Sequence, residues 1–312
     1  MRHLGLCDLG DAGESVPPAD GPAWPEPARG RPGDRFHPQR SRSAHPGQRR
    51  VPRPRRGRPP VRVLQPPERA LALVDNGRLM PVDIALIHPE RPALIDDLGT
   101  TVTFAELLDR ATRLGRAMHA AGVPVGGHVG TLTENRAEFF ELYLASMLSG
   151  IWLVPINGLL APSEVTYVAR DADLAMIFAE GDLAALAPDD ITTIRFGEPY
   201  EAMIRKGDPT PFALDAPAGS RFSYTSGTTG HPKGVKRAIP AALDEMLAVQ
   251  RNAGHDVAMT GEGVHLVTGP AYHAAVGGFA FFDLCNGATL RIMRKFDAAR
   301  TLELIEQEQV RR

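Results

Sequence analysis

The sequence predicts an α/β fold with mostly parallel sheets, because short apolar strands and amphipathic helices alternate along most of the chain. Apolar runs of five or six residues recur at 92–96, 128–132, 151–155 and 174–179, and the segments between them show helical spacing. The chain has 312 residues, of which 43% are apolar and 23% charged, so it can bury a sizeable core.

Residues 1–79 differ from the rest and are expected to form a disordered tail. Residues 1–70 hold 14 of the 28 prolines and 14 arginines, against 7 acidic residues and no lysine. Such a segment has no apolar period and cannot offset its own chain entropy. A basic arm for nucleic acid is an alternative, but no aromatic residue is interleaved with the arginines of RRVPRPRRGRPP, so nucleic acid is not an expected partner. A start of translation at Met80 is a third interpretation.

The folded part is expected over residues 80–312, and its first helices carry recognisable end signals. Thr103 and Glu106 have the spacing of a capping box at the start of TFAELLDRATRLGRAMHAAG, and the glycine that closes this run, Gly122, is placed to end the helix. Asn135 and Glu138 are expected to cap the next helix, AEFFELYLASMLS. A further strand is predicted at 288–293, followed by a last helix.

Bulk properties indicate a protein of a reducing compartment, and we expect it in the cytoplasm. The net charge is −2, and the two cysteines, Cys7 and Cys285, have no metal-binding spacing. The most apolar run, at 276–285, is too short to span a bilayer. Acidic residues near the N-terminus argue against a signal peptide. The oligomeric state cannot be predicted.

Residues 224–237 read YTSGTTGHPKGVKR and form the strongest functional signal. The run follows a predicted strand at 221–226 and precedes a predicted helix at 241–254, a position where α/β sheets gather ligands. Glycines let backbone N–H groups converge on phosphate oxygens, and hydroxyls and a lysine add donors and charge. The expected cofactor-binding residues are Thr225, Ser226, Gly227, Thr228, Thr229, Gly230, Lys233 and Gly234. A flexible surface linker is the alternative.

The motif YTSGTTGHPKGV resembles the signature phosphate loop of the AMP-forming adenylating enzymes, the family that includes the acyl-CoA synthetases. Further resemblance runs from about residue 82 to the end, including GPAYHAAVGG at 269–278. The resemblance implies an incomplete N-terminal large domain of the adenylate-forming fold. It also implies ATP, Mg²⁺ and CoA as cofactor and co-substrates, with a small carboxylic acid as the partner molecule.

Tyr272 and His273 stand in this second motif, whose aromatic residue and histidine the resemblance places beside the acyl substrate and the α-phosphate. The resemblance therefore implies that both bind substrate and that His273 is catalytic. Amino-acid-activating members have an aspartate in this motif, which is absent here. A simple carboxylic acid, such as a fatty, aryl or sterol-side-chain acid, is therefore expected, and no metal-ligating residue is predicted. For His273, an ordinary loop histidine is the alternative.

Several of the family's later features have no counterpart in these 312 residues: the carboxylate for Mg²⁺, the ribose-binding aspartate and the C-terminal domain with its catalytic lysine. We therefore expect a truncated acid–CoA ligase of fatty-acid metabolism that is inactive alone. Two alternatives stay open: a non-catalytic nucleotide-binding remnant, and an Arg/Pro-rich interaction protein on an α/β scaffold. An unpaired sheet edge is expected where the chain stops.

Overall fold

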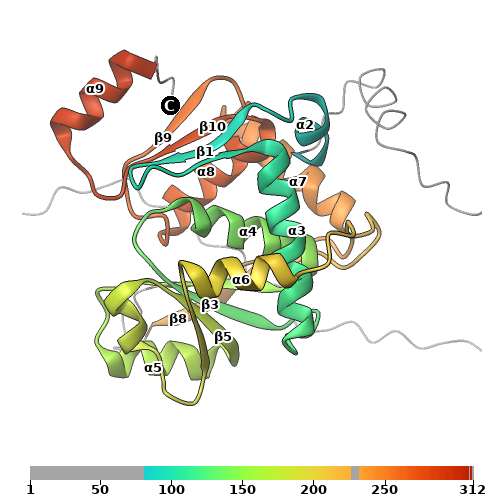
Figure 1. The fold of residues 1–312 in the computed structure, drawn as a ribbon, viewed down its shortest axis with the longest axis vertical. Helices are drawn as coiled ribbons and strands as arrows, with labels where there is room; N and C mark the ends of the chain where they lie inside the picture. The colour runs from blue at the N-terminus through green and yellow to red at the C-terminus, as the bar shows by residue number, and fades with distance from the viewer. Residues whose placement is uncertain (1–80, 226–231, 309, 311–312) are drawn as a thin grey trace, which may run out of the picture. The chain divides into compact units, whose positions relative to one another are not determined.

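The computed structural model describes residues 81–225, 232–308 and 310, which lie within one compact unit, Val61–Arg312 (Figure 1). The helices are α2 (Pro81–Ile87), α3 (Phe104–Ala120), α4 (Ala137–Ser149), α5 (Pro162–Asp171), the 3₁₀ helix η1 (Gly181–Leu186), α6 (Glu198–Lys206), α7 (Leu243–Asp256), α8 (Ala274–Asn286) and α9 (Ala298–Glu308). The strands are β1 (Pro92–Asp96), β2 (Thr101–Thr103), β3 (His128–Leu132), β4 (Trp152–Ile156), β5 (Leu174–Ala179), β6 (Thr192–Arg195), β7 (Ser220–Thr225), β8 (Lys233–Lys236), β9 (Val264–Val267) and β10 (Thr289–Ile292).

The α/β prediction is confirmed, with the strands divided between two sheets. The first sheet has the order β2-β1-β10-β9, and the second has the order β6-β5-β3-β4-β7-β8. Neighbouring strands are parallel except for two antiparallel pairs, β1 with β2 and β7 with β8. Each antiparallel strand lies at the edge of its sheet, so the centres of both sheets are parallel and buried.

Helix α3 begins and ends as its sequence predicts. The Thr103 side chain accepts a hydrogen bond from the Glu106 amide at 3.2 Å, and the Glu106 carboxylate accepts one from the Thr103 amide at 2.8 Å. Gly122, just beyond the C-cap residue, has a φ of +96°. Only a residue that tolerates this left-handed conformation ends a helix in this way without strain.

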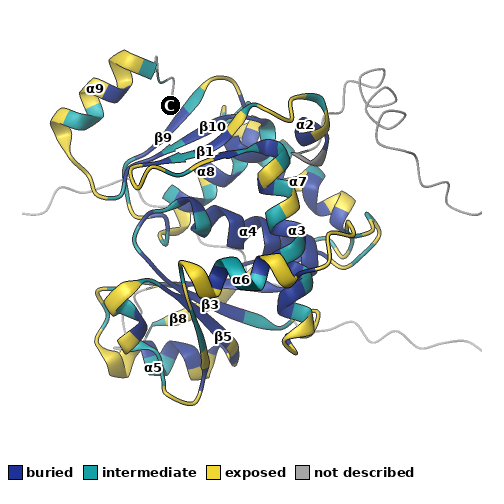
Figure 2. Ribbon diagram, viewed as in Figure 1, coloured by how far each residue is buried: buried dark blue, intermediate teal, exposed yellow. Residues whose placement is uncertain are grey.

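Helix α4 is buried all round and lies between the two sheets (Figures 1 and 2). The prediction that Asn135 and Glu138 cap this helix is wrong. The N-cap residue is Arg136, whose side chain makes no capping bond, and the first amide, that of Ala137, donates to Asp96 Oδ2 at 3.2 Å. The cap therefore comes from Asp96, at the end of β1 in the first sheet. Local sequence spacing does not reveal a capping residue so far away in the chain.

Two apolar clusters pack against the second sheet. The larger contains side chains of α3, α4, α7 and α8 together with both sheets, and the smaller lies between the second sheet and α5. Phe222 belongs to the smaller cluster, on the strand that leads into the predicted phosphate loop. Within residues 81–225 and 232–308, no helix is long and apolar enough to cross a membrane.

Candidate functional site

The predicted phosphate loop is the connection of a β-hairpin. Strands β7 and β8 pair antiparallel, and Thr225 lies opposite Lys233 at the base of the loop, where the Thr225 hydroxyl donates to the Lys233 carbonyl at 3.4 Å. The expectation that the loop leads toward a helix is corrected, because β8 intervenes and α7 begins only at Leu243. The intervening predicted residues Ser226, Gly227, Thr228, Thr229 and Gly230 lie outside the described residues.

Lys233 and Gly234 occupy the first two positions of β8. The Lys233 side chain is exposed, and no carboxylate among the described residues forms an ion pair with it. Gly234 lies so close to the Phe222 ring that a Cβ atom there would come within 2.6 Å of it. The closeness of this ring is by itself a sufficient reason for a glycine at position 234. A contact between Gly234 and a ligand stays a prediction.

The loop lies at the carboxyl edge of the second sheet, because β7 runs parallel to β4. A pocket of about 390 Å³ opens at the carboxyl ends of strands from both sheets. Segments 133–135 and 157–159 of its lining follow β3 and β4, whereas 268–270 and 294–296 follow β9 and β10. The carboxyl ends of parallel strands are where open α/β sheets bind ligands, so the pocket and the loop define the candidate site.

Asn135 joins the two sheets at this pocket. Its Nδ2 donates to the carbonyl oxygens of Gly269 at 2.7 Å and Met293 at 2.9 Å, and its Oδ1 accepts from the Ala271 amide at 2.8 Å. The buried amide thereby fixes the segments that follow β9 and β10. Sequence reasoning missed this role, because its partners lie more than 130 residues away.

Arg221 connects the phosphate-loop strand to the segment that carries Tyr272. Its guanidinium donates to the Ala271 carbonyl at 3.4 Å and to the Tyr272 carbonyl. Burial lowers the pKa of Arg221. Thr225 is four positions after Arg221, a span of about 13 Å in a strand. The two motifs singled out from the sequence are therefore brought together.

Tyr272 and His273 have different surroundings. Tyr272 is half-buried and lines the pocket, whereas His273 is exposed at the N-cap position of α8. Their rings lie 4.5 Å apart between centroids. Of the predicted substrate-binding pair, only Tyr272 is a lining residue of the pocket. The ring of His273 forms no hydrogen bond with the residues that the structure describes.

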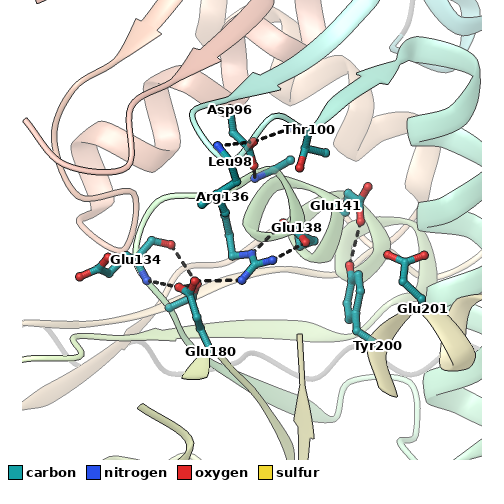
Figure 3. A network of polar contacts seen from close by, with 12 residues as sticks. Asp96, Leu98, Thr100, Glu134, Arg136, Glu138, Glu141, Glu180, Tyr200 and Glu201 are labelled. Carbon is teal, nitrogen blue, oxygen red and sulfur yellow. Dashed lines mark hydrogen bonds and ion pairs between the residues drawn. The ribbon is translucent and has the colours of Figure 1, made fainter. Parts of the chain in front are cut away.

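A network of ion pairs borders the pocket (Figure 3). Arg136 pairs with Glu138 at 2.6 Å and with Glu180 at 3.0 Å, and Arg294 pairs with Glu180 at 2.7 Å and Glu134 at 3.0 Å. Burial raises the pKa of Glu180, but the two arginines outweigh burial and keep that pKa below its usual value. The network links the ends of β3 and β5 to the end of β10, and sequence patterns do not predict it.

No group of three or more His, Cys, Asp or Glu side chains suited to a metal ion occurs in residues 81–225 and 232–308.

Comparison with known proteins gives the class. Residues 84–311 match the model of the family described as AMP-binding enzyme. The chain therefore belongs to the AMP-binding enzyme family, as its phosphate-loop motif indicates. An indoleacetate–CoA ligase from Aromatoleum aromaticum is 31% identical over 255 residues, which cover 74% of this chain and 46% of the relative.

A fatty acid–[acyl-carrier-protein] ligase from Streptomyces coeruleorubidus is 29% identical, over 70% of this chain and 43% of its own. The chain thus spans less than half the length of these curated relatives. Among solved structures, the inhibitor-bound N-terminal domain of FACL13 from Mycobacterium tuberculosis is similar, with a TM-score of 0.63 and 26% identity, over 74% of this chain and 60% of that one. The prediction of the N-terminal large domain of the adenylate-forming fold is confirmed, and this chain covers 60% of that solved domain.

Proposed function

We propose that this chain carries the phosphate-binding and acid-binding part of an AMP-forming carboxylic acid–CoA ligase. One observation carries the proposal most directly: Arg221, on the strand that enters the phosphate loop, is bonded to the backbone of Ala271 and Tyr272 beside the pocket. The strand that enters the loop for the polyphosphate is thereby bonded to the segment beside the pocket for the organic reactants.

The proposed chemistry has two steps. The carboxylate oxygen attacks the α-phosphorus of ATP, the bond to the β-phosphate oxygen breaks, and pyrophosphate leaves with the electron pair. A thiolate of CoA then attacks the acyl carbon, and AMP leaves. The exposed Lys233 is assigned to the β- and γ-phosphates, together with the hydroxyls and amides of Thr225 to Gly230, because preorganised donors stabilise the charge on a departing pyrophosphate. His273 is assigned to the reacting carboxylate and α-phosphate.

The pocket favours a simple acid with an apolar body, such as a fatty or aryl acid. Its lining is mostly apolar and includes Leu159, Leu183, Tyr272 and Phe296. Among the described lining residues, the one acidic side chain, Glu134, is already paired with Arg294 and Lys295, so this lining leaves no carboxylate for a substrate ammonium group. Relatives named as ligases of indoleacetate and of fatty acids agree with this choice.

The test uses the 312-residue chain with ATP, AMP, CoA and two acids, octanoate and cinnamate. We expect calorimetry to detect ATP binding, and we expect thioester formation to stay at background, because the chain spans 46% or less of the ligases compared above. Thioester formation would contradict the truncated-ligase account and show a complete ligase. Failure to bind either nucleotide would favour the scaffold alternative.

A further inference from the structure

Strand β8, which carries Lys233, is weakly held by its own sheet. It is an edge strand of four residues, paired only with β7, and all four residues are exposed. An exposed edge strand of this length gains little from burial. The position of Lys233 therefore depends on whatever else fixes β8.

Lys236, at the other end of β8, reaches the core of the second sheet. Its Nζ lies 3.0 Å from His128 Nε2 and 4.3 Å from the centre of the Trp152 ring. His128 and Trp152 are the first residues of the central strands β3 and β4 and lie opposite each other in the ladder. One hydrogen bond and one cation–π contact thus attach the edge strand to the rigid centre.

The geometry also specifies the protonation state of His128. Its Nδ1 lies 2.5 Å from the carbonyl oxygen of Ala172, which can only accept, so Nδ1 carries the hydrogen. Nε2 is then unprotonated and accepts from the Lys236 ammonium group. A second proton on His128 would remove this acceptor and place two positive charges within 3.0 Å of each other.

The charged groups around His128 favour the neutral ring. Burial lowers the pKa of His128, the hydrogen bond to Ala172 opposes this, Lys236 lowers the pKa further, and Asp173 raises it. Asp171, which precedes Ala172 in the chain, accepts a hydrogen bond from Tyr224 on β7 at 2.5 Å. On balance the pKa stays below the ordinary value of 6.5, so the ring accepts from Lys236 near neutral pH.

We propose that His128, Trp152 and Lys236 form an anchor that positions β8 and, three residues away, Lys233 at the base of the phosphate loop. This inference rests on the proposed function, because Lys233 matters only if a polyphosphate binds there. His128 is a positioning residue: it acts through Lys236 and touches no reactant. A small displacement of a cation relative to a phosphate is enough to weaken binding markedly.

Two variants test the anchor, and each removes one partner of the hydrogen bond. Lys236→Met removes the donor and its charge, whereas His128→Leu removes the acceptor and leaves the lysine charge in place. Lys206→Met, an exposed lysine at the end of α6, is the matched control for loss of a surface charge. Circular dichroism and thermal melting first establish that each variant is folded.

The first measurement needs no nucleotide. NMR titration of the imidazole should give a higher pKa for His128 in Lys236→Met than in the wild-type chain or in Lys206→Met, and amide exchange in β8 should be faster. An unchanged His128 pKa together with unchanged β8 exchange would overturn the anchor, whatever the chain binds.

The second measurement is ATP affinity as a function of pH. We expect both anchor variants to bind ATP about tenfold more weakly than the wild-type chain at pH 7.5, with Lys206→Met unchanged and Lys236→Arg close to wild type. Below the pKa of His128, the wild-type affinity should fall toward that of the variants. Equal ATP affinity in all chains would overturn the positioning role. A wild-type chain that binds no ATP would contradict the proposed function and this role, while the first measurement still decides whether the anchor exists.

Discussion

The carboxylate of Asp96 accepts a hydrogen bond from the amide of Ala137, so the last residue of β1 in the first sheet caps helix α4 between the sheets. The same side chain accepts from the amides of Leu98 and Thr100, each at 2.9 Å, and is buried (Figure 3). One carboxylate thus joins the first sheet, the following turn and the central helix.

Replacing this carboxylate should destabilise the whole unit. Asp96→Ala leaves three amides without their acceptor, and we expect a loss of about 1–3 kcal/mol in the free energy of unfolding. Urea denaturation of the full chain measures this. Asp109→Ala, which removes an exposed carboxylate paired with Arg113 on α3, is the control and should change stability by less than about 1 kcal/mol. A loss no greater than that of the control would show that the cap is dispensable.

The buried carboxylate of Glu141 gives a second prediction. It lies on α4, 2.6 Å from Arg110 and 3.0 Å from the hydroxyl of Tyr200, which donates to it. Arg110→Met leaves this charge buried without its cation, so we expect a loss of about 3–5 kcal/mol at pH 7. Adding Glu141→Gln should recover part of that loss. No recovery in the double variant would contradict the assignment.

The free energy of unfolding of Arg110→Met should depend on pH in a defined way. Burial raises the pKa of Glu141 even with Arg110 in place, and removing Arg110 raises it further. The folded variant then binds a proton at pH values where the unfolded chain does not, so its stability relative to wild type should increase as pH falls toward 4.5. Urea midpoints of the two chains between pH 8 and pH 5 test this, and a difference that does not narrow would contradict it.

His128 should make the folded state less stable as the pH falls into the acidic range. Its pKa is lowered in the folded state, so the unfolded chain binds the proton first as pH falls below about 6.5. The stability that the neutral ring contributes is complete above 6.5 and is lost as pH falls toward the lowered pKa. The difference in unfolding free energy between wild type and His128→Leu should therefore shrink from pH 7.5 to pH 5, and a constant difference would disprove this linkage.

We also propose that the domain boundary lies near Met80. A chain that starts at Met80 should show the same helix content in total and the same unfolding midpoint as the full chain, because residues 1–79 contain no core-forming pattern. Circular dichroism of the two chains measures both quantities. A loss of helical signal in the shorter chain would place structured residues in the tail.

Much of the fold could be predicted because its signals are local. The box formed by Thr103 and Glu106 and the glycine at position 122 predict the ends of α3, and the apolar runs at 92–96 and 174–179 coincide with β1 and β5. These features depend on neighbours a few residues away, which spacing along the chain records directly.

What the sequence could not predict depends on distant contacts. Strand β8 contains lysines and a glycine and has no apolar alternation, so only its pairing with β7 makes it a strand. Asn135 has the spacing of a cap, but its partners belong to the other sheet. The phosphate-loop motif is indicated by its residue types, and Tyr272 only by the resemblance to the family. The arginine that joins these two segments, Arg221, carries no signal in the sequence.

The most direct test of the central claim, that the hairpin loop binds the polyphosphate of ATP, is calorimetry of Lys233→Ala with two ligands. Lys233 is assigned to phosphates that ATP has and AMP lacks, so the variant should bind ATP at least about tenfold more weakly than the wild-type chain and AMP with nearly unchanged affinity. Lys206→Met, measured beside it, should match wild type for both. Equal losses for ATP and AMP in Lys233→Ala, or no loss for either, would contradict the assignment of this loop.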